Sequence, residues 1–374
     1  GDRTQQPAGT PRHGRTLKPP FSGIQNIDYA GNFDDFVNEL RGDQPFCFWL
    51  GALEPHRGFE QGSGIKTGKN PASVVVPRIF PDQEIVRSDM LDYLVEIEHF
   101  DAMVARAIAT LEKRGLLDNT IIVVTADNGM PFPHCKGYAY NNSDHLPLAI
   151  MWPHGIAKPG RVVDDYVSFI DFAPTFLEVA GIEQSQSGMA AITGRSLTEI
   201  FKSDQSGRVI PGRDHVLIGK ERNDVGRPND EGYPIRGIVK DGMLYLHNFE
   251  IDRWPGGVVE TGYKDTDDSP TKTAVLATKS MPKDNHYFAA SFGKLPSDQL
   301  FDLKSDPDCM TNLASTVSFA ALKTQLFDEL KQQEDPRVLG NGDVYDKYPY
   351  GNESKRNFYD RIMRGEKIEQ TKEE

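Results

Sequence analysis

The chain has 374 residues, of which 38% are hydrophobic and 26% charged, with 42 lysines and arginines against 55 aspartates and glutamates. Its formal net charge of -13 disfavours nucleic acid as a partner, because nucleic-acid binding depends on an excess of positive charge. Three cysteines cannot all pair within one chain, so no disulfide framework is expected. No apolar run reaches the length of a membrane span.

The first predicted elements are one strand and one long helix. Residues 1–20 are rich in Gly, Pro, Arg and Thr and predict no strand, whereas the apolar run Pro45–Ala52 predicts a buried one. A helix ended by Gly115 in the C′ position follows, with apolar residues at helical spacing: Leu94, Ile97, Val104, Ile108 and Leu111. Asp101 falls on this stripe, and we interpret it as a buried structural acid.

The run Thr120–Ala126 predicts a central parallel strand, and it ends in Asp127-Asn128-Gly129. A strand, helix, strand order makes neighbouring strands parallel, which brings their carboxyl ends to one edge of the sheet. His56, which follows the first strand, is then expected to share a site with Asp127 and Asn128. The alternative is a simple Asx turn, in which Gly129 supplies the positive φ.

A loop from Met130 to Asp144 leads to another predicted strand, Leu146–Trp152. Lys136 is a cation in this loop, and alone it is typical of a solvated surface residue. An oxyanion substrate would explain why these residue types occur together, because cations and proton donors bind oxyanions and oxygen ligands hold a hard cation. Lys136 would then act with His56 and Arg57, while two oxygen-bearing side chains would hold a hard cation.

The large α/β region is predicted to end between about Ser203 and Gly212, which divides the chain into domains 1–210 and 211–374. The second is expected to carry a smaller antiparallel sheet with a hairpin turn at Asp241-Gly242, from these strands: Val216–Gly219, Ile235–Lys240 and Met243–Asn248. A helix at Ala320–Gln332 is predicted to pack on it. Residues Asp252–Asp298 indicate a long and partly mobile excursion.

Glu221 and Arg222 follow the first of these strands and are candidates for contacts to sugar hydroxyls or a carboxylate. The alternative is a solvated loop, since charge runs are commonly exposed.

These residues, taken together, resemble the sulfatases of the alkaline-phosphatase-like superfamily. The resemblance rests on the segment from Trp49 to Arg57, the turn at Asp127, Lys136, and the Leu146-Pro147-Leu148 strand. It continues through "FIDFAPTFLEVAGI" at Phe169–Ile182, "GRSL" at Gly194–Leu197 and "LFDLKSDPDCMTNLA" at Leu300–Ala314. Within the family, "EPHRGF" and "DNGMPFP" are most similar to the heparan N-sulfatase branch.

The resemblance implies a role for each candidate. Asp127 and Asn128 would be two ligands of a calcium ion, Lys136 would contact a sulfate oxygen, and His56 would contact the sulfate or assist the leaving group. Substrate binding would involve three further residues: Arg57, Glu221 and Arg222.

The family's nucleophile is a formylglycine made from a C/S-x-P/A-x-R motif, and this motif does not occur in the sequence. The family's upstream Asp-Asp pair and its Lys and His partners have no clear match either, and the nearest candidate, Arg12-His13-Gly14, lacks the lysine. We therefore expect the chain to be N-terminally incomplete and to be inactive alone. We also expect it to bind calcium weakly or not at all. Its partners would be a sulfated sugar and either its own N-terminal portion or a second copy.

The predicted fold class is α/β, an alkaline-phosphatase-like sheet sandwiched by helices, with a smaller C-terminal α+β domain carrying an antiparallel sheet. The expected function is hydrolysis of sulfate esters or N-sulfamides, on glycosaminoglycan-derived sugars such as N-sulfoglucosamine. Two alternatives stay open, a phosphatase or phosphonate hydrolase of the same superfamily and a non-catalytic sugar-binding relative. The resemblance implies a periplasmic, secreted or lysosomal location, although no signal peptide is recognisable in the sequence.

Overall fold

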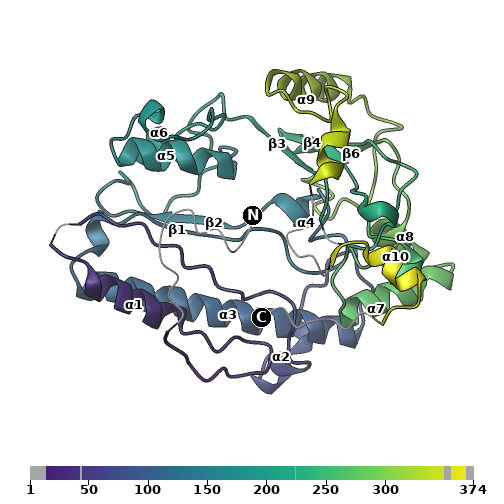
Figure 1. The fold of residues 1–374 in the computed structure, drawn as a ribbon, viewed down its shortest axis with the longest axis horizontal. Coiled ribbons are helices and arrows are strands. Elements are labelled where there is room, and N and C mark those ends of the chain that lie inside the picture. The colour runs from purple at the N-terminus through teal and green to yellow at the C-terminus, as the bar shows by residue number, and fades with distance from the viewer. Residues whose placement is uncertain (1–13, 43, 224, 349–354, 368–374) are drawn as a thin grey trace. The chain divides into compact units, whose positions relative to one another are not determined.

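The computed structural model describes residues 14–42, 44–223, 225–348 and 355–367 (Figure 1). Contacts divide them into two compact units, each described here by itself. Unit 1 comprises the described residues up to Thr120 together with Pro131–Pro133 and Asp267–Phe288. Unit 2 comprises Ile121–Met130, His134–Thr266 and the described residues from Ala289 onward.

Unit 1 is built around one helix of 30 residues, α3 (Glu84–Lys113). Three other helices pack along it: α1 (Tyr29–Glu39), α2 (Ser63–Lys66) and α7 (Pro270–Ala277). As predicted, α3 ends before Gly115, which has a φ of 67° and donates its N–H to the Glu112 carbonyl over 3.0 Å.

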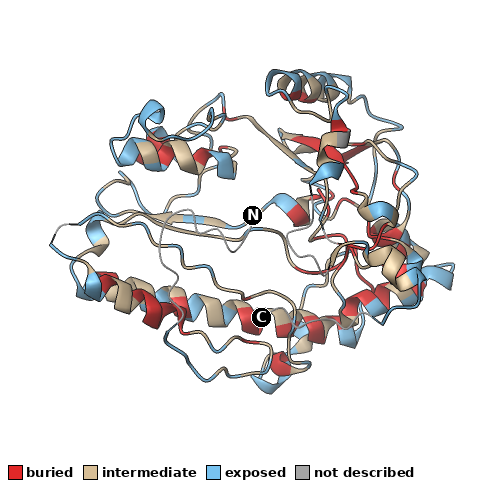
Figure 2. Ribbon diagram, viewed as in Figure 1, coloured by how far each residue is buried: buried red, intermediate tan, exposed pale blue. Residues whose placement is uncertain are grey.

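The buried face of α3 differs from the predicted stripe (Figure 2). Leu94 is 41% exposed and Asp101 is exposed, so the interpretation of Asp101 as a buried acid is wrong. The buried apolar positions are Val86, Leu91, Val95, Met103 and Leu111. Three carboxylates share this face, namely Asp89, Asp92 and Glu96. The spacing of apolar residues therefore predicted the wrong buried face for α3. Polar side chains occupy much of the face that is buried in the structure.

The predicted strand Pro45–Ala52 is also wrong, because the structure assigns no strand to these residues. Its aromatic side chains pack on α1 instead, with the ring centroids of Phe48 and Phe33 4.9 Å apart and those of Phe46 and Phe36 5.8 Å apart. Trp49 is 90% exposed. The run is therefore apolar because it covers a helix, and it pairs with no strand.

In unit 2, the Asp127 turn follows strand β1 (Ile122–Thr125), which pairs with β2 (Leu148–Met151) in a two-stranded sheet. The pairing is antiparallel, with Ile122 opposite Met151, and all four β1 residues are only partly buried. The expected parallel partner and full burial of this strand are therefore wrong. The carboxyl end of β1 still leads directly into Asp127 and Asn128.

The predicted antiparallel sheet of the C-terminal region is confirmed. It has four strands in the order β3-β4-β5-β6: His215–Lys220, Ile235–Lys240, Met243–Asn248 and Asp298–Asp302. Asp241 and Gly242 have φ angles of 50° and 79°, as a tight hairpin turn requires, and Lys240 lies opposite Met243. Helix α9 (Ala320–Gln332) packs on the sheet through Leu326 and Leu330, at its predicted position.

The expected excursion Asp252–Asp298 contains α7 and α8 (Asn285–Phe292). Ser269 caps α7 by accepting a hydrogen bond from the Lys272 N–H, and Pro270 occupies the first turn. These helices were missed because eight residues carry little periodicity. The remaining helices are α4 (Asn141–Asp144), α5 (Phe172–Val179), α6 (Thr198–Lys202) and α10 (Phe358–Met363).

Two of the motif segments pack together around a buried ion pair. Arg213, 1% exposed, donates to Asp171 over 2.8 Å, and Asp171 also accepts from the Arg195 N–H over 2.7 Å. A Cβ on Gly194 would collide with the Ile170 carbonyl, so only glycine allows this approach. Thus "FIDF" and "GRSL" are residues that build the fold.

Candidate functional site

Arg57 is held by protein groups in unit 1. Its guanidinium makes a bidentate pair with Asp89, at 2.5 and 3.0 Å, and its Nε donates to the Pro131 carbonyl over 2.8 Å. It also stacks on the rings of Phe59 and Phe132, at 4.6 and 4.3 Å from their centroids. The side chains of Arg57 and Asp89 are only 9% and 2% exposed, so this pair fixes the loop.

His56, on the same loop, is partly buried. Its Nδ1 lies 3.1 Å from the Arg57 carbonyl oxygen. The backbone N–H of His56 donates to the Leu53 carbonyl over 2.8 Å. Both contacts restrain the ring and its backbone. The backbone on either side of the imidazole is therefore fixed before any ligand arrives.

A buried pair of acids beside this loop was missed by the sequence analysis. Glu54, 6% exposed, accepts from the Gln25 N–H over 2.8 Å, and Glu96 of α3 is 2% exposed. Burial, together with the nearby Glu54 carboxylate, raises the pKa of Glu96 to about 8. The sequence does show Glu54 directly after an apolar run, at the start of "EPHR", which could have suggested a buried acid. Nothing in the sequence indicates that Glu54 lies near Glu96.

Asp127 and Asn128 project from a loop whose backbone is fixed in unit 2. Asp127 is exposed and Asn128 partly buried. The Gly129 N–H donates to the Ser143 carbonyl over 2.9 Å, and a Cβ on Gly129 would collide with the Asn142 carbonyl. Glycine is needed here for close approach, so the turn presents two oxygen-bearing side chains from a fixed base.

Lys136 belongs to the same loop. Its N–H donates to the Met130 carbonyl over 3.2 Å, which returns the chain to a point two residues beyond Asn128. The Ser143 hydroxyl donates to the Cys135 carbonyl over 2.7 Å. These contacts bring the backbone at Lys136 close to Met130, near the segment that bears Asp127 and Asn128. That these three residues share one site stays a prediction.

A buried polar cluster, also missed, supports the Lys136 loop. Lys220 donates to the Gly137 carbonyl, and burial lowers its pKa to about 8, although the nearby Asp265 opposes this change. Asp265 accepts a hydrogen bond from Arg227. Gly137 has a φ of 84°, and a Cβ there would collide with the Asn223 side chain. A charged residue at the end of β3 was the signal available in the sequence.

Glu221 and Arg222 line a hollow of about 200 Å³ in unit 2. Glu221 accepts from Arg236 over 2.7 Å and from Arg337 over 2.8 Å. Arg222 donates to the Tyr348 carbonyl over 2.6 Å. The interpretation of these two residues as a solvated charge run therefore does not describe Glu221, whose side chain is 18% exposed.

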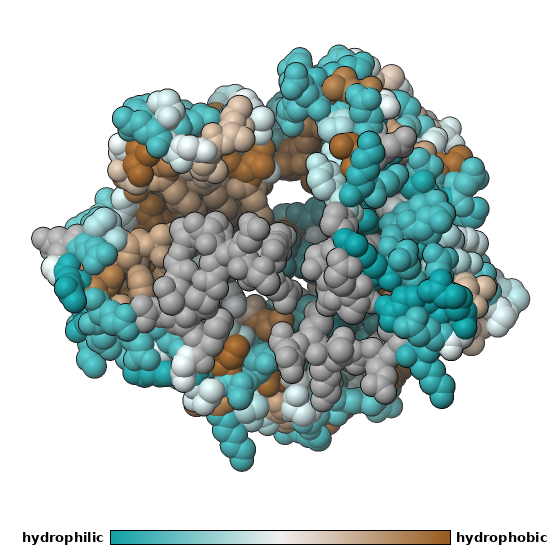
Figure 3. Space-filling view, viewed as in Figure 1, coloured by the Kyte–Doolittle hydropathy of each residue, from teal (hydrophilic) through white to brown (hydrophobic). Residues whose placement is uncertain are grey.

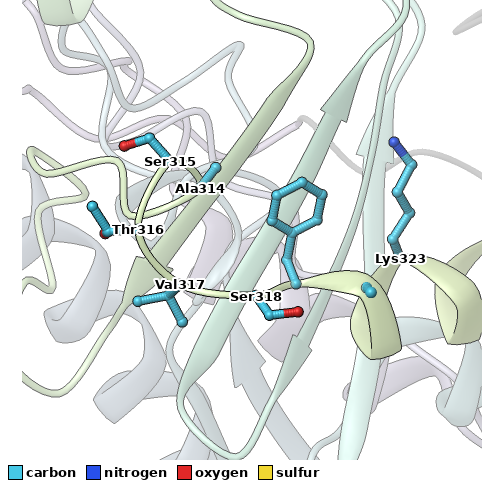
Figure 4. A pocket seen from close by; sticks show the side chains of 8 residues that line it. Ala314, Ser315, Thr316, Val317, Ser318 and Lys323 are labelled. Carbon is cyan, nitrogen blue, oxygen red and sulfur yellow. The ribbon is translucent and has the colours of Figure 1, made fainter.

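A larger, shallower hollow of about 450 Å³ lies on the segment that leads into α9 (Figure 4). Its lining is Ala314, Ser315, Thr316, Val317, Ser318, Phe319, Ala320 and Lys323. Lys323 donates to Asp298 over 2.9 Å, and Phe319 stacks on Tyr245 at 5.1 Å. This hollow includes none of the candidate site residues predicted from the sequence.

Few of the described side chains are arranged so that they could bind a metal ion. Among the described residues, no group of three or more His, Cys, Asp or Glu side chains is arranged to hold a metal ion. Asp127 and Asn128 are hard-oxygen donors of the kind calcium prefers, but calcium takes roughly 6 to 8 oxygens. These residues alone do not make a calcium site, and we derive no chemical step through the ion.

Comparison with known proteins shows which family the first half of the chain resembles. A sulfatase family model matches residues 12–182. This part of the chain is therefore similar to sulfatase domains. Human N-sulphoglucosamine sulphohydrolase is 25% identical over 326 residues, which are 78% of this chain and 61% of that protein. The chain thus spans less than two thirds of the length of this relative and of two others, the ulvan-active sulfatase of Formosa agariphila and arylsulfatase K of Xenopus laevis.

Solved structures give the fold. YidJ of Bacteroides fragilis, a protein assigned to the sulfatases, has a TM-score of 0.58 and 18% identity over 84% of this chain and 61% of that chain. A phosphonate monoester hydrolase of Agrobacterium radiobacter has a TM-score of 0.55 and 17% identity over 84% and 60%. The predicted alkaline-phosphatase-like fold is therefore confirmed. In the described part of the chain, no helix combines the length and apolarity needed to cross a bilayer.

Proposed function

We propose that this chain belongs to a sulfatase-type hydrolase of sulfate esters or N-sulfamides, acting on glycosaminoglycan-derived sugars such as N-sulfoglucosamine. The observation that carries the proposal is the loop from Asp127 to Lys136 within a sulfatase-family match. It joins two oxygen donors and one cation on a fixed backbone. The similarity to N-sulphoglucosamine sulphohydrolase supports the choice of sugar.

In this proposal, Lys136 donates to a sulfate oxygen and stabilises the charge that develops there during S–O or S–N cleavage. Asp127 and Asn128 would contribute two of the oxygens that hold calcium, which would polarise the sulfate when bound. Glu221 and Arg222 would bind the sugar. Arg57, whose guanidinium already has protein acceptors on Asp89 and Pro131, would act on substrate through the loop that it fixes.

His56 would assist the leaving group, a role that requires a proton on the imidazole nitrogen that faces the substrate. The imidazole is restrained by the 3.1 Å contact between its Nδ1 and the Arg57 carbonyl oxygen. The His56→Gln variant should therefore slow substrates with poor leaving groups more than aryl sulfates. An equal decrease in turnover for both kinds of substrate would contradict the assignment of His56 to the leaving group.

The nucleophile does not come from the sequence in hand, because the C/S-x-P/A-x-R motif does not occur in it. We propose that this chain shows no turnover by itself, since binding groups alone cannot form the covalent intermediate of such a mechanism. A segment carrying the motif, with its formylglycine installed, should restore turnover when it is added.

The test is hydrolysis of N-sulfoglucosamine, an aryl sulfate and a phosphonate ester, with the chain alone and with that segment added. Sulfate release only in the mixture supports the proposal. Turnover by the chain alone, with mass spectrometry excluding any added fragment, contradicts the missing nucleophile. Preference for the phosphonate would favour the phosphonate hydrolase, and binding without turnover in the mixture would favour a sugar-binding protein.

A further inference from the structure

The hollow beside Glu221 lies between the end of β3 and the short helix η8 (Gly342–Lys347). Its lining is Glu221, Arg222, Gly232, Tyr345, Asp346 and Tyr348. We propose that this Glu221 hollow binds a single uncharged, hydroxyl-rich sugar ring. The inference deepens the proposed function, because Glu221 and Arg222 are among its substrate contacts, and it adds the two tyrosines and the charge class of the ligand.

Glu221 is a pre-oriented hydrogen-bond acceptor. Its Oε1 accepts from Arg236 Nη2 over 2.7 Å and Arg337 Nε over 3.3 Å, and its Oε2 accepts from Arg337 Nη2 over 2.8 Å. Arg236 is fixed in turn by Asp335, 2.8 Å from its Nε. An ionised carboxylate offers about four lone-pair sites, so three bonds leave capacity for a ligand hydroxyl. A sugar would meet this acceptor without reordering it.

The side chains that line the Glu221 hollow, taken with the groups that bond to Glu221 and Arg236, carry no net charge. Three guanidinium groups, those of Arg222, Arg236 and Arg337, balance three carboxylates, those of Glu221, Asp335 and Asp346. Burial opposes the charge on Arg337, but the hydrogen bond and attraction to Glu221, with a smaller contribution from the Asp346 carboxylate, together outweigh it and raise the pKa of Arg337. A sulfate or carboxylate ligand would therefore find no unbalanced cation here, whereas an uncharged ring would not disturb the balance.

The size and the aromatic side chains fit one sugar ring. A volume of about 200 Å³ is smaller than the roughly 300 to 1,000 Å³ of pockets for drug-sized ligands. The Tyr345 ring is held beneath the Arg337 guanidinium, 5.9 Å from its centroid, while Tyr348 is 59% exposed. The Tyr348 carbonyl is anchored by Arg222. An exposed aromatic face beside fixed acceptors suits the apolar C–H face and polar rim of a pyranose.

The test is titration of the full chain with N-acetylglucosamine and glucuronate at low ionic strength, followed by calorimetry and saturation-transfer NMR. We expect a dissociation constant near about 1 mM for N-acetylglucosamine, weaker binding of glucuronate, and a roughly three- to tenfold loss of affinity in Tyr348→Ala. Trp49→Ala is the matched control, because Trp49 is an exposed aromatic outside the hollow. It should bind as the unchanged chain does.

A second variant tests the charge argument. Asp346→Lys turns the neutral hollow positive, so it should bind glucuronate more tightly than the unchanged chain does. Undetectable N-acetylglucosamine binding, equal loss in both aromatic variants, tighter glucuronate than N-acetylglucosamine binding in the unchanged chain, or no response to Asp346→Lys would overturn the inference. None of these measurements requires hydrolysis, so failure of the sulfatase proposal leaves them interpretable, and the reverse also holds.

Discussion

Glu96→Gln should remove a large pH dependence of stability in unit 1. Burial, reinforced by the neighbouring Glu54, raises the pKa of Glu96 from 4.5 to about 8 in the folded chain. Between these two pH values the folded state keeps a proton that the unfolded state has lost. The contribution of Glu96 to the free energy of unfolding is therefore largest below about pH 4.5, falls as the pH rises to about 8, and is constant above it.

The size of this effect follows from the two pKa values. At about 1.4 kcal/mol per pH unit, a change from 4.5 to about 8 corresponds to roughly 5 kcal/mol. Relaxation and water entry reduce such penalties, so we expect about 2 to 4 kcal/mol. A glutamine mimics the protonated acid, and Glu96→Gln should be nearly neutral at pH 5 and stabilising by that amount at pH 8.5.

Urea unfolding from pH 5 to 9 measures this difference directly, because all other titrating groups are shared by the two proteins. Glu112→Gln is the matched control, since Glu112 is exposed on the same helix, and its stability should track that of the unchanged chain. Glu54→Gln removes the nearby carboxylate, whose repulsion adds to burial in raising the pKa of Glu96. The stability loss in this variant should therefore be smaller and should be complete at a lower pH than in the unchanged chain. Parallel stability curves for the unchanged chain and Glu96→Gln would refute the reasoning.

Four further outcomes are expected. Calorimetry should detect no calcium binding tighter than roughly 1 mM, because Asp127 and Asn128 are too few ligands, and tight binding would contradict this. When the chain is mixed with a segment that carries the formylglycine motif, Lys136→Ala should lower turnover roughly 10²- to 10³-fold. Lys158 is exposed, and the control variant Lys158→Ala should leave turnover unchanged. Arg213→Met should cost about 3 to 5 kcal/mol in urea unfolding because it strands the buried Asp171, and Asp171→Asn should restore part of this. Self-association, seen as concentration-dependent sedimentation, should weaken in Phe176→Ser, because Phe176 of α5 is an apolar side chain that is 44% exposed. Figure 3 shows apolar surface in the region of α5, and unchanged sedimentation would exclude this surface.

The sequence predicted the C-terminal sheet well, and the reasons are local. Asp241-Gly242 specifies a two-residue hairpin, and leucines at steps of four specify α9. The same reasoning failed for Pro45–Ala52, because an apolar run does not say what will cover it. Phe46 and Phe48 cover a helix, where a strand partner was expected.

The candidate site could be proposed from the sequence only where its residues are contiguous. Asp127, Asn128 and Lys136 lie within ten residues, and glycine at 129 allows the loop to close on Ser143. The groups that support the site come from distant segments and carry no local signal. Lys220 reaches Gly137 across 83 residues, and its burial cannot be read from the charged run that it begins.

Charge in a motif segment has two physical uses, and exposure separates them. Arg57 is buried, and Asp89 and Pro131 already accept its hydrogen bonds, so substituting it would first leave the buried Asp89 carboxylate without its cation. Asp127 is exposed on a backbone that Gly129 and Ser143 hold rigid, so it can meet a ligand without losing an internal partner first. A buried, paired charge therefore argues for building the loop, and an exposed charge on a fixed loop argues for contact with substrate or metal.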